Sequence, residues 1–225
     1  MKYHIDFDIE LRRNPYKGLY IAFEGIDGSG KTTQVERLKK YFEEKKPVVL
    51  TSEPRISSLV GRLIYDILQG KFKISSTAFQ YLCTADRIMN HKDVVEPSLK
   101  AGKTVLSHRS LWSNVPHGLL DRGVTNYNSP DTKLIQVTQG LMSMYHQFIV
   151  PDTTFYLRVS VDTVLSRLAK MKKIKQIYEK KEKLEKIANG YEWQIKQFPK
   201  EFVVIDGEES EEEVTREIIG KISNS

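Results

Sequence analysis

Cysteine, histidine and long hydrophobic runs are all scarce in this chain. Cys83 is the only cysteine, which excludes a disulfide within the chain and a cysteine-rich metal site. The five histidines are scattered and form no ligand spacing. No run approaches the ~20 apolar residues of a membrane span, and residues 1–10 alternate acidic with apolar residues instead of forming a signal sequence. We therefore expect a cytoplasmic protein without a membrane partner.

Positive charge is in excess, but it is unevenly distributed. The formal net charge is +6, and lysines concentrate between residues 170 and 186, whereas residues 208–213 are strongly acidic. A nucleic-acid groove would need positive charge along much of the chain. We therefore expect no nucleic-acid partner. The basic segment is either a solvated helix face or a contact for a phosphorylated small molecule.

The chain has the length and composition of one folded domain. It contains 225 residues, of which 40% are hydrophobic, enough to form a core. At its start, apolar residues alternate with polar ones until Asn14 and Pro15 end the pattern. This period of two predicts an extra strand, at a sheet edge or donated to a partner. We therefore divide the chain into an N-terminal extension, 1–18, and a main domain, 19–225.

Strand and helix patterns alternate through the main domain. Strands are predicted at 19–24, 47–51, 103–107, 153–159 and 202–206, and helices at 31–45, 58–69, 77–91, 94–101, 131–148, 161–171, 178–197 and 210–223. Such alternation is typical of an α/β fold with a parallel sheet covered by helices on both faces. Ligands of these folds bind beyond the carboxyl ends of the strands.

Local signals support some helix boundaries. Thr77 with Gln80, and Ser210 with Glu213, have the spacing of a capping box, which predicts helix starts at 77 and 210. Within 177–198, six apolar or aromatic residues recur at helical spacing, and we interpret this stripe as a packing surface: Ile177, Leu184, Ile187, Tyr191, Ile195 and Phe198.

The most specific motif runs from Gly25 to Thr32. It reads Gly-Ile-Asp-Gly-Ser-Gly-Lys-Thr and matches the phosphate-binding pattern G-x-x-x-x-G-K-[ST] between a predicted strand and a predicted helix. Backbone N–H groups of such a loop and the helix N-terminus bind a polyphosphate. Lys31 is expected to reach the β- and γ-phosphates, and the Thr32 hydroxyl to bind Mg²⁺.

Three arginines lie where an acceptor phosphate could bind. Arg55 follows the second strand, Arg109 follows the third, and Arg87 lies on a helix between them. Phosphoryl transfer needs in-line positioning and cations around the spreading negative charge. Planar guanidinium groups supply bidentate donors for a second phosphate.

The chain from Leu19 to its C-terminus resembles the thymidylate kinase family. The segments that carry the resemblance are 23–34, Glu53-Pro54, Ala85-Asp86-Arg87, 105–109, 151–157 and 204–206. The first is the most specific, because an aspartate two residues after the opening glycine is a trait of this family. The family implies a P-loop NTPase fold with a central five-stranded parallel sheet and a short lid.

The resemblance also implies an activity and its residues. It implies transfer of the ATP γ-phosphoryl group to the 5′-phosphate of dTMP or a related pyrimidine monophosphate, with Mg²⁺, by a homodimer built by helix packing. Asp27 matches the carboxylate that holds the sugar 3′-hydroxyl, and Arg109 the arginine that contacts the transferred phosphoryl group. Arg55 approximately matches an acceptor-phosphate ligand, Arg87 an arginine near the base carbonyl, and Arg167 one beside adenine.

The predicted site therefore has four parts. The catalytic residues are Lys31 and Arg109. The ATP-binding residues are Gly25, Asp27, Gly28, Ser29, Gly30, Lys31, Thr32, Thr33 and Arg167. The substrate-binding residues are Asp27, Arg55, Arg87, Arg109 and Ser113, and the metal ligand is Thr32.

The chain departs from the family pattern on the acceptor and lid sides. His108 replaces an aspartate that helps to organise Mg²⁺, and Cys83 replaces the phenylalanine that stacks on thymine. His117 replaces an aromatic residue that disfavours a ribose. Residues 168–178 contain lysines but no lid arginine. These departures leave the base and sugar preference open.

Two other functions are compatible with the sequence. His108-Arg109-Ser110 also resembles the Glu-Arg-Ser of deoxynucleoside kinases, although the glutamate is missing. The loss at His108 would also fit an ATP-binding regulatory protein descended from a kinase. A GTPase is disfavoured because no Asn-Lys-x-Asp guanine signature occurs.

Overall fold

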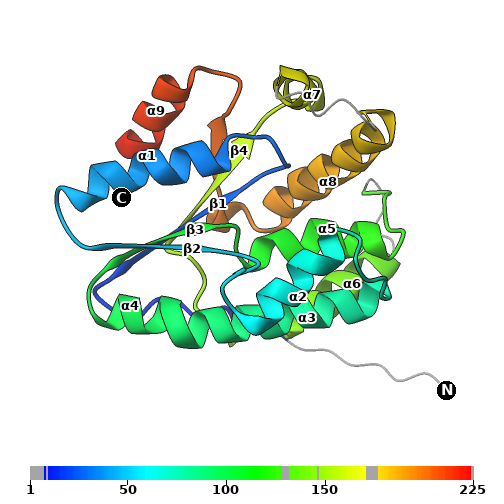
Figure 1. The fold of residues 1–225 in the computed structure, drawn as a ribbon, viewed down its shortest axis with the longest axis horizontal. Helices are drawn as coiled ribbons and strands as arrows, with labels where there is room; N and C mark the ends of the chain where they lie inside the picture. The colour runs from blue at the N-terminus through cyan, green and yellow to red at the C-terminus, as the bar shows by residue number, and fades with distance from the viewer. Residues whose placement is uncertain (1–7, 9, 128–131, 146, 171–176, 224–225) are drawn as a thin grey trace.

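The main domain is built on one parallel sheet, seen in the computed structural model in Figure 1. The structure describes residue 8 and residues 10–127, 132–145, 147–170 and 177–223. The strands are β1 (Leu19–Glu24), β2 (Val48–Ser52), β3 (Thr104–His108), β4 (Thr153–Arg158) and β5 (Val203–Asp206). Their order is β2-β3-β1-β4-β5, and all neighbours are parallel. The predicted five-stranded parallel sheet is confirmed.

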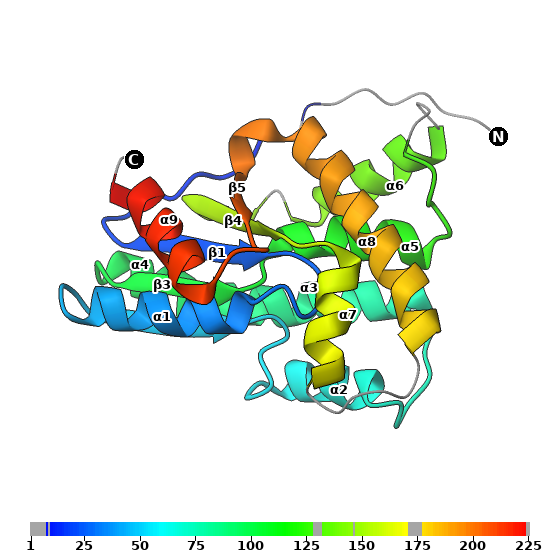
Figure 2. The ribbon, with the colours of Figure 1, turned by 90° about the horizontal axis from the view of Figure 1, so that it is seen from above.

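Helices cover both faces of the sheet (Figures 1 and 2). They are α1 (Lys31–Glu43), α2 (Leu59–Leu68), α3 (Ser76–Asn90), α4 (Glu96–Lys100), α5 (Asn114–Asp121), α6 (Thr132–Ser143), α7 (Val161–Lys170), α8 (Ile177–Gln197) and α9 (Glu211–Ser223). Short turns of other helix types occur at η1 (His91–Val95), η2 (Leu111–Ser113) and η3 (Pro199–Glu201).

Alternation along β1 divides the core into two layers. Phe23 lies in a cluster with Leu38 of α1 and Val214 of α9. Tyr20, of the opposite parity, packs with Leu99 of α4. Because successive strand residues point to opposite faces, Glu24 shares the face of Tyr20 and not that of Phe23. On this other side α5, α6 and α8 pack around their own apolar cluster. Glu24 is therefore directed into the protein on the side of α5 and α8.

The region predicted as two helices, 77–91 and 94–101, is one continuous helical stretch. The π-helical turn η1 joins α3 to α4 without a break. Pro97 has no N–H to bond the preceding turn, and the wider turn before it accommodates that loss. The predicted capping box at Thr77 is wrong. Ser75 is the N-cap, and its hydroxyl accepts a hydrogen bond from Ala78 N at 3.2 Å. The predicted box of Ser210 and Glu213 is confirmed, with hydrogen bonds in both directions.

Helix α5 has no counterpart among the predicted elements. Pro116 lies in its first turn, where a missing N–H costs no intrahelical bond. Gly118 faces α6, and a Cβ there would come within 2.7 Å of Leu141. Proline and glycine, which argue against a helix in sequence, are here compatible with the helix and with its close contact to α6.

The described part of the N-terminal extension packs against the main domain. Arg12 forms an isolated parallel bridge with Ile149, and the Asn14 side chain donates to Gly18 O and to Asp152 Oδ2, both at 2.8 Å. The predicted strand falls mostly on residues 1–7 and 9, which lie outside the described residues. Residues 8, 10 and 11 are not in a strand.

Candidate active site

The glycine loop has the conformation that its motif requires. Gly25, Gly28 and Gly30 have φ values of 139°, 87° and 97°, a region that other residues rarely adopt. At Gly25 a Cβ would also come within 2.8 Å of Leu157 O and of Ser29 Oγ. Helix α1 begins directly after Gly30, so its first N–H groups face the loop. The loop is thus shaped to bind an anion.

Lys31 is buried and bonds back to the loop itself. Its Nζ donates to Gly25 O at 3.0 Å and to Ile26 O at 2.9 Å. Burial and the charge of Arg109 lower the pKa of Lys31 to about 7, although Asp27 and Glu24 oppose this shift. Bound phosphate would favour the charged ammonium. Thr32 is exposed beside it, and Thr33, half-buried, is the third residue of α1.

Arg109 and Asp27 form a close ion pair at the mouth of the loop. Arg109 Nη2 lies 2.6 Å from Asp27 Oδ1. The Asp27 side chain remains 79% exposed, whereas that of Arg109 is 12% exposed. Desolvation would raise the pKa of Asp27, but the charges of Arg109 and Lys31 hold it down, at about 2. Asp27 is therefore an exposed anion beside two cations.

A buried carboxylate that sequence analysis missed lies behind this pair. Glu24 is fully buried and accepts hydrogen bonds from Ser110, from Ser113 Oγ and from Tyr191 OH. Glu24 lies within the segment 23–34 that carries the family resemblance, but as the last residue of a strand it showed no role of its own in the sequence. Tyr191 belongs to the stripe interpreted as packing surface, and its ring does pack on Tyr156. Its hydroxyl also belongs to the site.

Arg87 lies deeper than the other arginines. It is buried against Glu53, and its guanidinium also donates to Ser110 O at 3.0 Å and stacks over the Tyr145 ring. Glu53 Oε1 and Arg87 Nη1 are buried without a hydrogen-bond partner among the described residues. Each member of the pair therefore has one polar atom left for a ligand or water.

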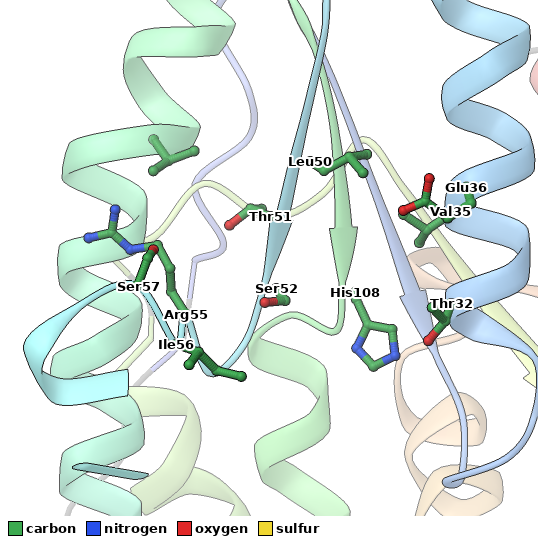
Figure 3. Close-up of a pocket in the computed structure, with 11 residues that line it drawn as sticks. Thr32, Val35, Glu36, Leu50, Thr51, Ser52, Arg55, Ile56, Ser57 and His108 are labelled. Carbon is green, nitrogen blue, oxygen red and sulfur yellow. The ribbon is translucent and has the colours of Figure 1, made fainter. Parts of the chain in front are cut away.

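Arg55 and His108 line a pocket of about 580 Å³ at the carboxyl ends of β2 and β3. In Figure 3, the His108 ring and the Thr32 hydroxyl approach the same space, while the Arg55 guanidinium points toward the neighbouring helix. Arg55 Nη2 lies 2.8 Å from Asp93 Oδ2 of η1. Burial, together with the charges of Lys31 and Arg109, lowers the pKa of His108 to about 4. The imidazole is therefore neutral near pH 7.

The remaining acceptor-side residues lie near two arginines: Ser113 and His117 near Arg109, and Cys83 near Arg87. Ser113 Oγ is 3.0 Å from Arg109 Nη1. His117 is half-buried near the Asp27–Arg109 pair, and its burial lowers its pKa to about 3. Cys83 is partly buried, which raises the pKa of its thiol to about 12. A protonated thiol and a neutral imidazole leave this part of the site without added charge.

Arg167 lies on α7, which packs beside the glycine loop. Its Nη2 donates to Gly207 O at 2.8 Å, and a Cβ at Gly28 would come within 3.0 Å of Val164 on the same helix. The predicted lid lysines at 172, 173 and 175 lie outside the described residues, as does the side chain of Lys170. Four of the predicted site residues therefore lie close together: Asp27, Lys31, Arg109 and Ser113. The other three arginines, Arg55, Arg87 and Arg167, lie around these four.

The site contains oxygen atoms that could bind a magnesium ion. Within the described part of the chain, no group of three or more His, Cys, Asp or Glu side chains could hold a metal. Mg²⁺ in phosphoryl-transfer sites needs fewer protein ligands, because phosphates and waters complete its shell. Thr32 offers a hydroxyl, and Glu53 Oε1 is a buried carboxylate oxygen without a partner in the described structure. These oxygens fit a hard cation.

None of the helices formed by the described residues combines the length and the apolar content needed to cross a bilayer.

The chain matches a known protein family. The family model described as thymidylate kinase matches residues 23–218. A thymidylate kinase of Fervidobacterium nodosum is 33% identical over 208 residues, 92% of this chain and 99% of the relative. One of Thermoanaerobacter sp. (strain X514) is 30% identical over 204 residues, 90% of this chain and 96% of the relative.

A third relative is similar over most of its length. The probable thymidylate kinase of Methanocaldococcus jannaschii is 35% identical over 208 residues, which cover 92% of this chain and 96% of the relative. The family match begins near the end of β1, at residue 23, and spans the glycine loop, the Asp27–Arg109 pair and strands β2 to β5. On these grounds the chain belongs to the thymidylate kinase family.

Proposed function

We propose that this protein transfers the γ-phosphoryl group of ATP to the 5′-phosphate of dTMP, giving ADP and dTDP. The observation that carries the proposal is the Asp27–Arg109 pair beside Lys31, within a chain of this family. A phosphate cradle alone would fit many nucleotide-binding proteins. A carboxylate and a guanidinium at its mouth add groups for a sugar hydroxyl and for a second phosphate.

On the donor side, the loop residues 25–30 and Lys31 bind the ATP phosphates. The Lys31 ammonium leaves its carbonyl partners for the β- and γ-phosphates and stabilises the developing charge. Thr32 and Glu53 would hold Mg²⁺, which would neutralise phosphate charge. Arg167 flanks the adenine, on the helix that packs against the loop.

On the acceptor side, Arg109 contacts the transferred phosphoryl group and Asp27 the sugar 3′-hydroxyl. Ser113 lies within reach of Arg109 and assists the same contact. Arg55 binds the acceptor phosphate, for which it must exchange its contact with Asp93. Arg87 reaches the base through Nη1, the guanidinium nitrogen left without a partner in the described structure. Cys83 and His117 adjust the base and sugar preference.

We also propose that the active form is a homodimer, built on α2 and α3. These two helices pack together and, with the segment between them, carry most of the exposed large apolar side chains among the described residues. Leu59 is 84% exposed, Tyr81 63% and Leu68 60%. Burying such a surface against a second copy removes apolar area from water. Light scattering should give twice the monomer mass for the wild type and the monomer mass for the double variant L68E/Y81E; an unchanged dimer would contradict this interface.

The partners that we propose are therefore nucleotides and a second copy of the chain. Nucleic acid is not expected, since the positive charge is local. The cytoplasm remains the expected location, because the proposed substrates are soluble nucleotides.

Coupled ADP-release assays with a panel of acceptors test the proposed function. ATP turnover stimulated most by dTMP is the expected result, and K31A should abolish it. Stimulation by thymidine in place of dTMP would instead identify a deoxynucleoside kinase. Tight ATP binding without turnover on any acceptor would identify a regulatory ATP-binding protein, for which the neutral His108 is the supporting observation.

A further inference from the structure

Glu24 is a buried carboxylate with no role in the function proposed so far. It is 0% exposed, and both of its oxygens are used. Oε1 accepts from Ser110 N at 2.7 Å and from Ser110 Oγ at 2.8 Å, and Oε2 accepts from Ser113 Oγ at 2.5 Å and from Tyr191 OH at 2.8 Å. Burying a carboxylate is costly unless hydrogen bonds and charge compensate. Four donors converge on this one.

The two hydroxyl groups on Oε2 also hold Arg109. Arg109 Nη1 donates to Ser113 Oγ at 3.0 Å and to Tyr191 OH at 3.1 Å, while Nη1 itself lies 3.8 Å from Glu24 Oε2. Each hydroxyl has one proton, and donating it to Glu24 leaves only lone pairs for Arg109. Arg109 can only donate, so both hydroxyls accept from it, and Glu24 takes the hydroxyl protons that would otherwise compete with Nη1.

Tyr191 stays protonated in this arrangement. Burial, followed by the charge of Glu24, raises its pKa well above the ordinary value. Its hydroxyl is therefore a donor to Glu24 across the working pH range.

Glu24 also restrains the backbone beside Arg109. Arg109 has φ 76°, which residues other than glycine rarely adopt. Its N–H donates to Phe23 O at 3.0 Å, and its carbonyl accepts from Ser107 Oγ at 2.6 Å. The next N–H, of Ser110, donates to Glu24. Neighbouring residues of β1 thus hold consecutive residues of the Arg109 turn.

We propose that Glu24 is a positioning residue for phosphoryl transfer, which fixes the Arg109 guanidinium through Ser113, Tyr191 and the Ser110 backbone. This proposal rests on the proposed function, in which Arg109 contacts the transferred phosphoryl group. Glu24 touches no substrate in this account. Its effect is to hold the catalytic guanidinium in one orientation before the acceptor binds.

The test compares E24Q with Y191F, R109K and the double variant E24Q/R109K. E24Q should lower kcat by about 10- to 100-fold, because the amide can donate and reverse the contacts. The affinity for ATP, measured without acceptor, should stay within about twofold. In the R109K background, E24Q should lower kcat by almost nothing further, because the arginine contacts that Glu24 supports are already lost. Multiplying losses in the double variant would overturn the proposal.

The matched control is E201Q, which removes a carboxylate whose side chain is 8% exposed and pairs with Arg13. Glu201 precedes β5 and so lies at the amino end of the sheet, away from the site. The E201Q substitution should lower Tm without lowering kcat. If E24Q does not fold, Y191F, which removes only one donor, should still lower kcat by about 3- to 10-fold; an unchanged kcat would overturn the proposal.

Side-chain NMR of arginine separates this proposal from the proposed function. The Arg109 guanidinium signal, assigned by its loss in R109K, should broaden or shift in E24Q and stay unchanged in E201Q. If the wild type shows no acceptor-stimulated turnover, the kinase assignment fails, and the Arg109 signal still decides the positioning role. An Arg109 signal that is the same in E24Q and wild type would overturn that role.

Discussion

Arg109 lies between two carboxylates of different exposure, and only the exposed one is within direct hydrogen-bond reach. Its Nη2 is 2.6 Å from Asp27 Oδ1, whereas Nη1 is 3.8 Å from the fully buried Glu24 Oε2. Asp27 can therefore exchange its partner for a substrate group, because water already reaches it. Glu24 cannot, since its four hydrogen bonds are internal to the protein. The guanidinium thus has one fixed side and one side available to a ligand.

The substitution D27N tests the exposed side. It removes a charge-assisted hydrogen bond, worth about 1.5–3 kcal/mol, and should lower kcat/KM for dTMP by about 10- to 100-fold. ATP affinity should change much less. The control is D66N, which removes a carboxylate that pairs with Lys71 at the surface of α2. Steady-state kinetics with dTMP varied at saturating ATP gives the result, and equal effects of D27N and D66N would contradict the assignment.

ATP binding should take up a proton through Lys31. The pKa of this lysine is about 7 in the free protein, so at pH 7.5 it is mostly neutral. Phosphate stabilises the ammonium, so ATP should bind with uptake of about 0.7 proton at pH 7.5, and affinity should fall as the pH rises above 7. Calorimetry in two buffers of different ionisation enthalpy measures this uptake.

The variant K31R is the control for that measurement, because arginine stays protonated at every working pH. It should bind ATP, more weakly, with no proton uptake from this position. Wild-type binding without proton uptake between pH 7 and 8 would contradict the lowered pKa.

Acid should destabilise the fold through His91. Burial, then the charge of Arg87, lowers its pKa to about 3, and its ring stacks on Phe148. Below the unfolded value of about 6.5 the unfolded chain binds a proton that the folded protein does not, so stability falls as pH falls. His91 should account for about 2 kcal/mol of the loss between pH 7 and pH 5. Urea unfolding should show this loss reduced in H91Q, and an equal loss in both proteins would contradict the expectation.

The N-terminal extension should contribute to stability and not to catalysis. Asn14 makes three hydrogen bonds, to Gly18 O, to Asp152 Oδ2 and from Tyr16 N. N14A should therefore cost about 2 kcal/mol and lower Tm by about 4–8 °C, with kcat unchanged. R13A removes a more exposed contact and should cost less than about 1 kcal/mol. A loss for R13A equal to that for N14A would contradict this ranking.

The fold was predictable where one local pattern decided the structure. Among the described residues, all five strands and eight of the nine α-helices correspond to predicted elements, because the apolar period and the length of the segment agree there. Helix α5 was missed because its tolerance of Pro116 and Gly118 depends on their place in the first turn and against α6. The cap at Thr77 was wrong since Ser75, two residues earlier, offers the same chemistry.

The site was predictable where a contiguous motif carries it. Gly25, Lys31 and Thr32 follow from the pattern, and Asp27 and Arg109 follow from the family. Glu24 and Tyr191 could not be found, because a carboxylate ending a strand and a tyrosine in a packing stripe acquire roles only when three segments meet. The roles of all these site residues, including Arg55, Arg87 and Arg167, stay predictions.

The most direct test of the central claim is to follow ATP, Mg²⁺ and dTMP with the protein by ³¹P NMR. ADP and dTDP should form in equal amounts, and neither should form with K31A. ADP without dTDP, or no loss of ATP with dTMP or any other monophosphate, would contradict the assignment of this chain as a dTMP kinase.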